Sequence, residues 1–204
     1  RALREYGVDL KQHHKVSGPE YEIRKLVSDA GFSFTANDRV ALGGAEVDIL
    51  VDGTGLAIEY NGIYWHSEKF KDPKYHQEKS IKAIESGIRL MHVWEDDWNN
   101  PVKRNILEKK ILHKLGVSDR RIFARKTEVR PVGAKEANRF MVENHIQGAI
   151  RGALWIGLYH QDELVACMGM KRKQDGVWDL VRYATSCSVV GGMSKLLKYF
   201  KNSN

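Results

Sequence analysis

Two carboxylates stand eleven residues apart in neighbouring segments that both have the pattern of β-strands. Asp48 lies in the polar–apolar alternation of residues 46–52, and Glu59 lies in the mostly apolar run 56–62. Asp52-Gly53 between them predicts a hairpin turn. On two antiparallel strands, the two carboxylates would face the same way and could share a hard cation such as Mg²⁺. The spacing alone is equally compatible with ordinary carboxylates on surface strands.

Glu59 and His66 strengthen the case for chemistry in this region. A carboxylate in a strand as apolar as that of Glu59 needs a partner or a metal, because leaving it unpaired costs several kcal/mol. His66 can exchange a proton near neutral pH, and Tyr64 and Trp65 beside it offer a stacking surface. A lone histidine can also be an ordinary core or surface residue. The remaining histidines show no HExxH spacing, so zinc hydrolysis has no support.

The surrounding segments predict a mixed α/β unit. Ser17-Gly-Pro-Glu20 has the residues of a capping box, so we expect a helix that ends at Gly31. The same reasoning predicts strands at 32–40, 46–52, 56–62 and 88–94, and helices at 75–86 and 101–115. After a polar connector, we expect a strand at 122–130, a helix at 134–144, strands at 153–159, 164–171 and 177–183, and a helix at 192–202.

Positive charge is concentrated in one segment of the chain. Residues 101–126 contain nine basic and two acidic side chains, a net charge of +7 that equals the formal net charge of the whole chain. Such a basic stripe indicates a surface that binds the phosphate backbone of nucleic acid, and its alternative is a solvated helix face. The candidate DNA-binding residues are Lys103, Arg104, Lys109, Lys110, Lys114, Arg120, Arg121, Arg125 and Lys126.

Composition excludes several classes of protein. The 204 residues are 42% hydrophobic and 29% charged, which is the balance of a globular protein with a real core. No apolar run is long enough for a membrane helix, and no apolar secretory segment follows the first residues. Two cysteines, Cys167 and Cys187, cannot form a disulfide framework, so we expect a reducing, cytoplasmic location.

At this point the sequence resembles a known family. The strings Glu46-Val-Asp-Ile-Leu, Ala57-Ile-Glu-Tyr-Asn-Gly-Ile-Tyr-Trp-His66 and Gly87-Ile-Arg-Leu-Met-His-Val-Trp-Glu-Asp-Asp-Trp98 resemble phage homing endonucleases related to the very-short-patch repair (Vsr-like) endonucleases. These belong to the PD-(D/E)xK superfamily. The resemblance covers about residues 17–116 and implies a metal-dependent DNA endonuclease whose sheet is flanked by helices.

The resemblance also implies roles for individual residues. Asp48 would be the central metal ligand, Glu59 a second ligand, and His66 the proton-transfer residue. Glu20 would support the metal or its water, although a capping box needs the same residue at that place. Asn61 stands where the superfamily carries the lysine of its ExK motif, so that lysine is missing. Lys79 or His76 could reach back into the same space, and each could equally lie on a solvated helix face. Asp72 has two alternatives: a further acidic group of the site, or part of an ordinary turn at Lys71-Asp-Pro73.

The second half of the chain resembles an N-acyltransferase-like domain. Its order of strands and helices and the segment Val181 to Leu197 carry this likeness. Gly191-Gly192 at a helix start could hold a pyrophosphate on free N–H groups. The string Ser188-Val-Val-Gly-Gly-Met193 departs from the acetyl-CoA pattern of that superfamily at its first and last positions, so a DNA-contacting or structural role is favoured, with Arg151, Lys171, Arg172, Lys173 and Arg182 available for phosphates.

We therefore expect an α/β nuclease core followed by a smaller α+β domain: an extension at 1–16, the endonuclease domain at 17–116, a linker at 117–122 and the accessory domain at 123–204. The expected function is Mg²⁺- or Mn²⁺-dependent hydrolysis of double-stranded DNA, as a site-specific phage homing endonuclease acting in a bacterial host. A homodimer on DNA and the absence of a membrane partner belong to this expectation. The alternatives are a mismatch-type repair nickase and an acyltransferase-like DNA-modifying protein whose role on DNA is non-catalytic.

Overall fold

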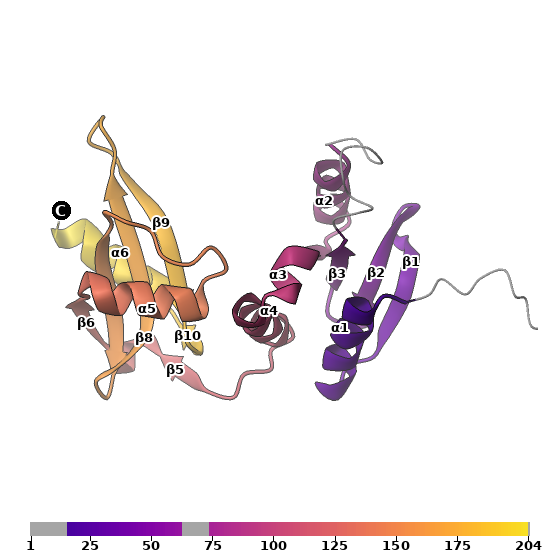
Figure 1. Cartoon of the computed structure of the whole chain (residues 1–204), viewed down its shortest axis with the longest axis horizontal. Helices are drawn as coiled ribbons and strands as arrows, with labels where there is room; N and C mark the ends of the chain where they lie inside the picture. The colour runs from indigo at the N-terminus through magenta and orange to yellow at the C-terminus, as the bar shows by residue number, and fades with distance from the viewer. Residues whose placement is uncertain (1–15, 63–73, 204) are drawn as a thin grey trace, which may run out of the picture.

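The computed structural model describes residues 16–62 and 74–203 (Figure 1). Its first part contains α1 (Gly18–Asp29), β1 (Phe34–Leu42), β2 (Ala45–Val51), β3 (Leu56–Asn61), α2 (Tyr75–Glu85), β4 (Arg89–Trp94), α3 (Glu95–Asn99) and α4 (Pro101–Lys114). Its second part contains β5 (Arg121–Phe123), the 3₁₀ turn η2 (Ala124–Lys126), β6 (Glu128–Pro131), α5 (Ala134–Asn144), β7 (Leu154–His160), β8 (Glu163–Arg172), β9 (Trp178–Thr185), β10 (Ser188–Val190) and α6 (Gly192–Ser203). None of these helices is long and apolar enough to cross a membrane.

The first four strands form one mixed sheet in the order β1-β2-β3-β4. β2 pairs antiparallel with both β1 and β3, whereas β3 pairs in parallel with β4. The parallel pair requires a crossover connection, and α2 supplies it. Apolar side chains from α1, α3 and α4 pack on one face of the sheet, and Ala83 of α2 packs on the other. The predicted mixed sheet flanked by helices is confirmed.

The second part of the chain holds two further sheets. β6, β7, β8 and β9 form an antiparallel sheet in that order, and β10 pairs in parallel with β5. Helix α5 packs on one face of the antiparallel sheet and α6 on the other (Figure 1). The two parts of the chain touch, because α4 contacts α5 and Ile146 packs against the core of the first sheet.

The sequence predicts most of these elements within a few residues of their bounds. The expected strand at 122–130 is wrong: Ala124–Lys126 forms a 3₁₀ turn that separates β5 from β6. The short helix α3 and strand β10 were not predicted. Along α4, Val102 is 50% exposed, whereas Ile106 and Ile111 are buried.

Candidate active site

The two predicted carboxylates meet where β2 and β3 separate. The antiparallel register runs through Val51–Leu56, Leu50–Ala57 and Ile49–Ile58, so the next opposed pair would be Asp48 and Glu59. The strand pairing stops there. In its place the backbone N–H of Tyr60 donates to Asp48 Oδ2 at 2.7 Å. Directly opposed residues share a face of a sheet, so both carboxylates point toward the face that α2 covers.

Lys79 reaches this face from the first turns of α2. Its ammonium donates to Glu59 Oε1, and the side chains of both residues are almost completely buried, at 3% and 5% exposure. Burial raises the pKa of Glu59 and the nearby Asp48 carboxylate raises it further, while Lys79 opposes both effects. Burial likewise raises the pKa of Asp48. Of the two alternatives for Lys79, the structure supports the one in which it reaches back to the carboxylates.

Glu20 stands at the edge of the same site and is held by Arg24. Ser17 caps α1 by accepting the backbone N–H of Glu20, as the sequence predicts. The Glu20 carboxylate accepts from Arg24, whose guanidinium also donates to Asn37 Oδ1 at 3.2 Å and to the backbone oxygen of Asp48 at 3.5 Å. Arg24 therefore links helix α1 to strand β2. Sequence reasoning missed Arg24; the i, i+4 spacing from Glu20 was the available signal.

Asn61, the last residue of β3, binds a histidine. It is fully buried, and its side-chain nitrogen donates to Nδ1 of His92 at 3.1 Å. His92 Nε2 then lies 3.2 Å from the hydroxyl of Ser80, which donates to the backbone oxygen of His76 at 2.7 Å. This chain of bonds requires a proton on Nε2 and none on Nδ1. Burial, together with His76 and Lys79, lowers the pKa of His92 to about 4 and keeps the ring neutral.

His76 lies beside this chain rather than against the carboxylates. Its ring packs edge-on against His92 and Trp94, with centroid distances of 5.6 and 5.1 Å. His66 and Asp72 lie outside the described residues. Of the sequence-predicted catalytic residues, the structure thus brings Asp48, Glu59 and Lys79 together, and places Glu20, Asn61 and His76 around them.

The chemistry of these side chains fits a small, hard cation. Among the described residues, no group of three or more His, Cys, Asp or Glu side chains is arranged to hold a metal. Mg²⁺, however, is commonly bound by only one or two carboxylates plus water and phosphate oxygens. Glu59 Oε2 and Asn61 Oδ1 are buried oxygen atoms that accept no hydrogen bond from any described residue, and both residues lie on the same face of β3. Asp48 and Glu59 can therefore hold the ion, whereas the Glu20 carboxylate already accepts a hydrogen bond from Arg24.

The basic stripe is divided by ion pairs. Lys103 pairs with Asp97, Arg104 with Glu22 and Glu108, and Arg120 with Glu163. Burial lowers the pKa of Lys114. The members that are exposed and make no ion pair with a described residue are Lys109, Lys110, Arg121, Arg125 and Lys126. The stripe therefore presents fewer free cations than its sequence suggests.

The second part of the chain shows no open cradle at Gly191-Gly192. A Cβ atom on Gly192 would lie 2.8 Å from the hydroxyl of Tyr183, and that hydroxyl accepts the backbone N–H of Met193. The first turn of α6 is thus already occupied by protein. The expected acyltransferase likeness has no support beyond the sequence pattern.

The chain has few detectable similarities to known proteins. No protein-family model and no curated protein matches the chain. Among solved structures, the catalytic domain of the homing endonuclease I-Bth0305I is similar, with 23% identity, 49% of this chain and 95% of that chain covered, and a TM-score of 0.41. A likeness this weak assigns no function to this chain.

Proposed function

We propose that this protein is a metal-dependent DNA endonuclease that hydrolyses phosphodiester bonds, of the site-specific homing type. The observation that carries the proposal is the cluster of the half-buried Asp48 with the buried pair of Glu59 and Lys79. Withdrawing these ionisable groups from water at a strand end costs free energy that apolar side chains would avoid. Perturbed carboxylates of this kind concentrate at functional sites.

Asp48 and Glu59 would hold Mg²⁺ or Mn²⁺ in this proposal. When bound, the ion polarises the phosphate and lowers the pKa of its water. The protein's own contribution is positional. The Tyr60 amide fixes one oxygen of Asp48, and Lys79 fixes one oxygen of Glu59, which leaves Glu59 Oε2 free to bind. The Lys79 ammonium also provides a positive charge close to the place where negative charge develops on the phosphate.

The basic character of the chain supports DNA as the substrate. The formal net charge is +7, and exposed cations that make no ion pair with a described residue lie on α4 and beyond it. Such side chains bind phosphates of any sequence and bring the duplex to the protein. The homing type is an inference from the sequence resemblance of residues 17–116.

The test is cleavage by the purified protein of supercoiled plasmids whose inserts supply a library of random candidate target sites, because a site-specific enzyme leaves a plasmid without its site intact. We expect cutting with Mg²⁺ or Mn²⁺, none after EDTA, and recovery when excess Mg²⁺ is restored. Nicked circles would indicate cutting of one strand, and linear plasmid cutting of both. Cutting that persists in EDTA would contradict the proposal. Plasmid that is bound but stays intact under all metal conditions would also contradict it, and would indicate a DNA-binding protein without catalysis.

A further inference from the structure

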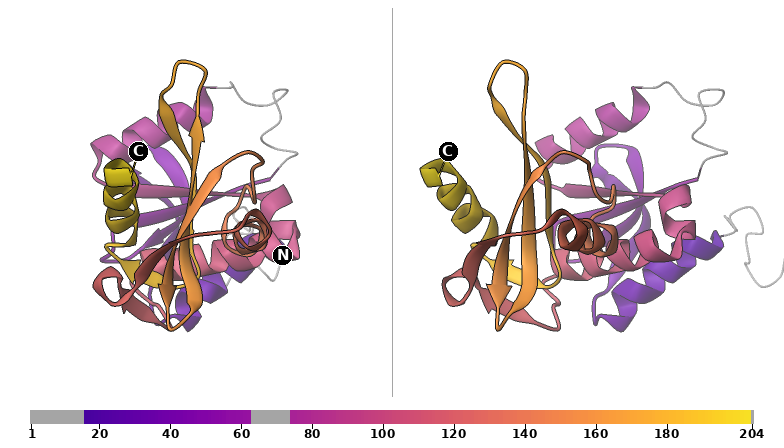
Figure 2. Two further views of the ribbon diagram at one scale, coloured as in Figure 1. Left: turned by 90° about the vertical axis from the view of Figure 1, so that its left-hand side faces the viewer. Right: turned by 60° about the vertical axis from the view of Figure 1, so that its left-hand side comes forward.

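The last residues of β8 and the first of β9 form a two-stranded ribbon beyond the sheet. The pairing of β7 with β8 ends at Leu154–Met170, whereas β8 and β9 remain paired through Lys171–Asp179 and Arg172–Trp178. A tight turn closes the ribbon. The hairpin projects past the other strands of its sheet in both views (Figures 1 and 2).

Internal contacts hold this hairpin in place and occupy its acidic residues. Lys173 pairs with Asp179 at 2.9 Å, and Asp175 accepts the backbone N–H of Val177 at 3.0 Å. The ring of Trp178 packs edge-on against Phe200 of α6, with 5.2 Å between centroids. The ribbon is therefore anchored at its base, and Asp179 is already paired with Lys173.

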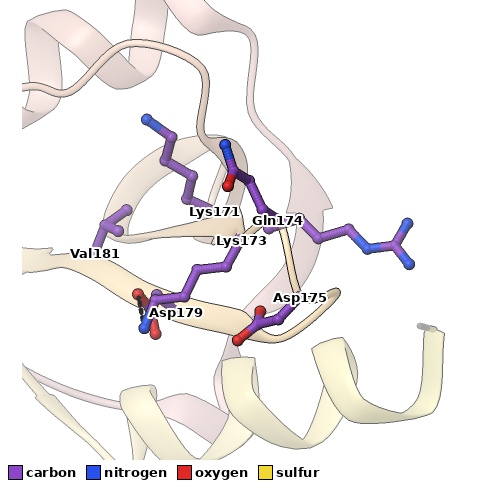
Figure 3. A pocket seen from close by; sticks show the side chains of 7 residues that line it. Lys171, Lys173, Gln174, Asp175, Asp179 and Val181 are labelled. Atoms are coloured by element: carbon purple, nitrogen blue, oxygen red, sulfur yellow. Dashed lines mark ion pairs between the residues drawn. The ribbon is translucent and has the colours of Figure 1, made fainter.

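Lys171 and Arg172 are the two cations that remain. Both are exposed, and neither makes an ion pair with any described residue. Consecutive residues of a strand point to opposite faces, so one cation lies on each side of the ribbon. Lys171 lines a hollow of about 560 Å³ at the hairpin, in which it extends away from the Lys173–Asp179 pair (Figure 3).

In Figure 1 the hairpin and α2, the helix that carries Lys79, lie in opposite halves of the molecule, but both lie on its upper side, as they do in Figure 2. A duplex whose phosphate lies at the candidate active site and that runs along this side would reach the hairpin. The major groove of B-DNA is about 12 Å wide and admits a two-stranded β-ribbon. The shape of the ribbon and its two exposed cations therefore both fit a DNA duplex as the partner.

We propose that the β8–β9 hairpin is a second DNA-binding element, which contacts phosphates of the duplex through Lys171 and Arg172. This inference rests on the proposed function for the identity of the partner, and it adds a contact remote from the carboxylates. Lys171 and Arg172 would hold the phosphates on either side of the ribbon, and the anchored strands would fix their separation. The contact would be independent of base sequence, because phosphates carry no direct sequence information.

The test is the salt dependence of binding to a 30-base-pair duplex in EDTA, so that binding is measured without cleavage. The variant is Lys171→Gln/Arg172→Gln. The slope of log K against log salt should shrink by about 1.8, since each lost phosphate contact removes about 0.9. The matched control is Lys135→Gln/Arg139→Gln on α5, which removes the same charges from exposed positions that also make no ion pair with a described residue. Its slope should equal that of the wild type.

Equal slopes for the hairpin variant and the wild type would overturn the inference, as would equal losses in the hairpin variant and the control. Metal-dependent cleavage is read separately on plasmid. Cleavage by the wild type with an unchanged hairpin slope would contradict the hairpin contact alone. A reduced slope without any cleavage would contradict the nuclease and leave the hairpin contact supported.

Discussion

The ammonium of Lys79 on α2 lies against the carboxylate of Glu59 on β3, although the two residues are 20 positions apart in the chain. The strand itself carries no basic residue, and Asn61 stands two positions after Glu59. Because α2 crosses the face of the sheet on which Glu59 and Asn61 lie, a helix supplies the positive charge that the strand lacks.

This pairing predicts a large effect on stability. Lys79→Met should lower the free energy of unfolding by about 3 kcal/mol at neutral pH, because it leaves a buried carboxylate without its partner. Adding Glu59→Gln should recover most of that loss. Urea unfolding checks both variants, with Lys82→Met on the exposed side of the same helix as the control. A Lys79→Met protein as stable as the control would contradict the buried pair.

Asp48 provides the sharpest test of catalysis. Asp48→Asn should abolish metal-dependent cleavage and keep DNA affinity within a few-fold, since phosphate contacts and not the metal ligand supply affinity. The asparagine oxygen can still accept the Tyr60 N–H, so the fold should be retained. Single-turnover cleavage and calorimetric titration with Mn²⁺ measure the two losses. Asp119→Asn, at an exposed position, is the matched control, and cleavage by Asp48→Asn at the control's rate would remove Asp48 from the site.

The sequence predicts the strands and helices of the site well, and its side-chain partners less well. Alternation and capping residues are local signals, so β2, β3 and α2 follow from neighbouring residues. The contacts of Arg24 and His92 depend on how helices pack on the sheet, which no local pattern encodes. Lys79 was one of two candidates, with His76, because the sequence resemblance implies a lysine at the position where Asn61 stands. The 3₁₀ turn at Ala124–Lys126 escaped prediction because the strand pattern of its flanking residues continued across it.

Buried His92 predicts a loss of stability in acid. The pKa of His92 is about 4 in the folded protein, against about 6.5 in an unfolded chain. Between these values the unfolded chain binds a proton that the folded protein does not, so stability falls as the pH drops from about 6.5 to about 4. The slope is at most about 1.4 kcal/mol per pH unit, and no effect is expected above this range.

Urea unfolding of the wild type and of His92→Gln across pH 7 to about 4 measures this contribution by difference. The two stability curves should converge as the pH falls, because the variant lacks the titrating group. His113→Gln, at an exposed position of α4, is the control for replacing a histidine. Parallel curves for the wild type and His92→Gln would contradict a neutral buried His92.

The divided basic stripe predicts which of its cations bind DNA. Lys109, Lys110, Arg121 and Arg125 are exposed and make no ion pair with a described residue, and the two arginines stack on the ring of Phe123 at 5.7 and 5.1 Å from its centroid. Replacing all four with Gln should reduce the salt slope of binding by about 0.9 for each phosphate contact, similarly on all sequences. Cleavage at saturating protein should stay near the wild-type rate.

The control variant is Lys103→Gln/Arg104→Gln, which removes cations already paired with carboxylates. It should reduce the slope by less per residue. An equal reduction per residue in both variants would show that the ion pairs do not withhold these side chains from DNA, and an unchanged slope in the quadruple variant would identify the stripe as a solvated face.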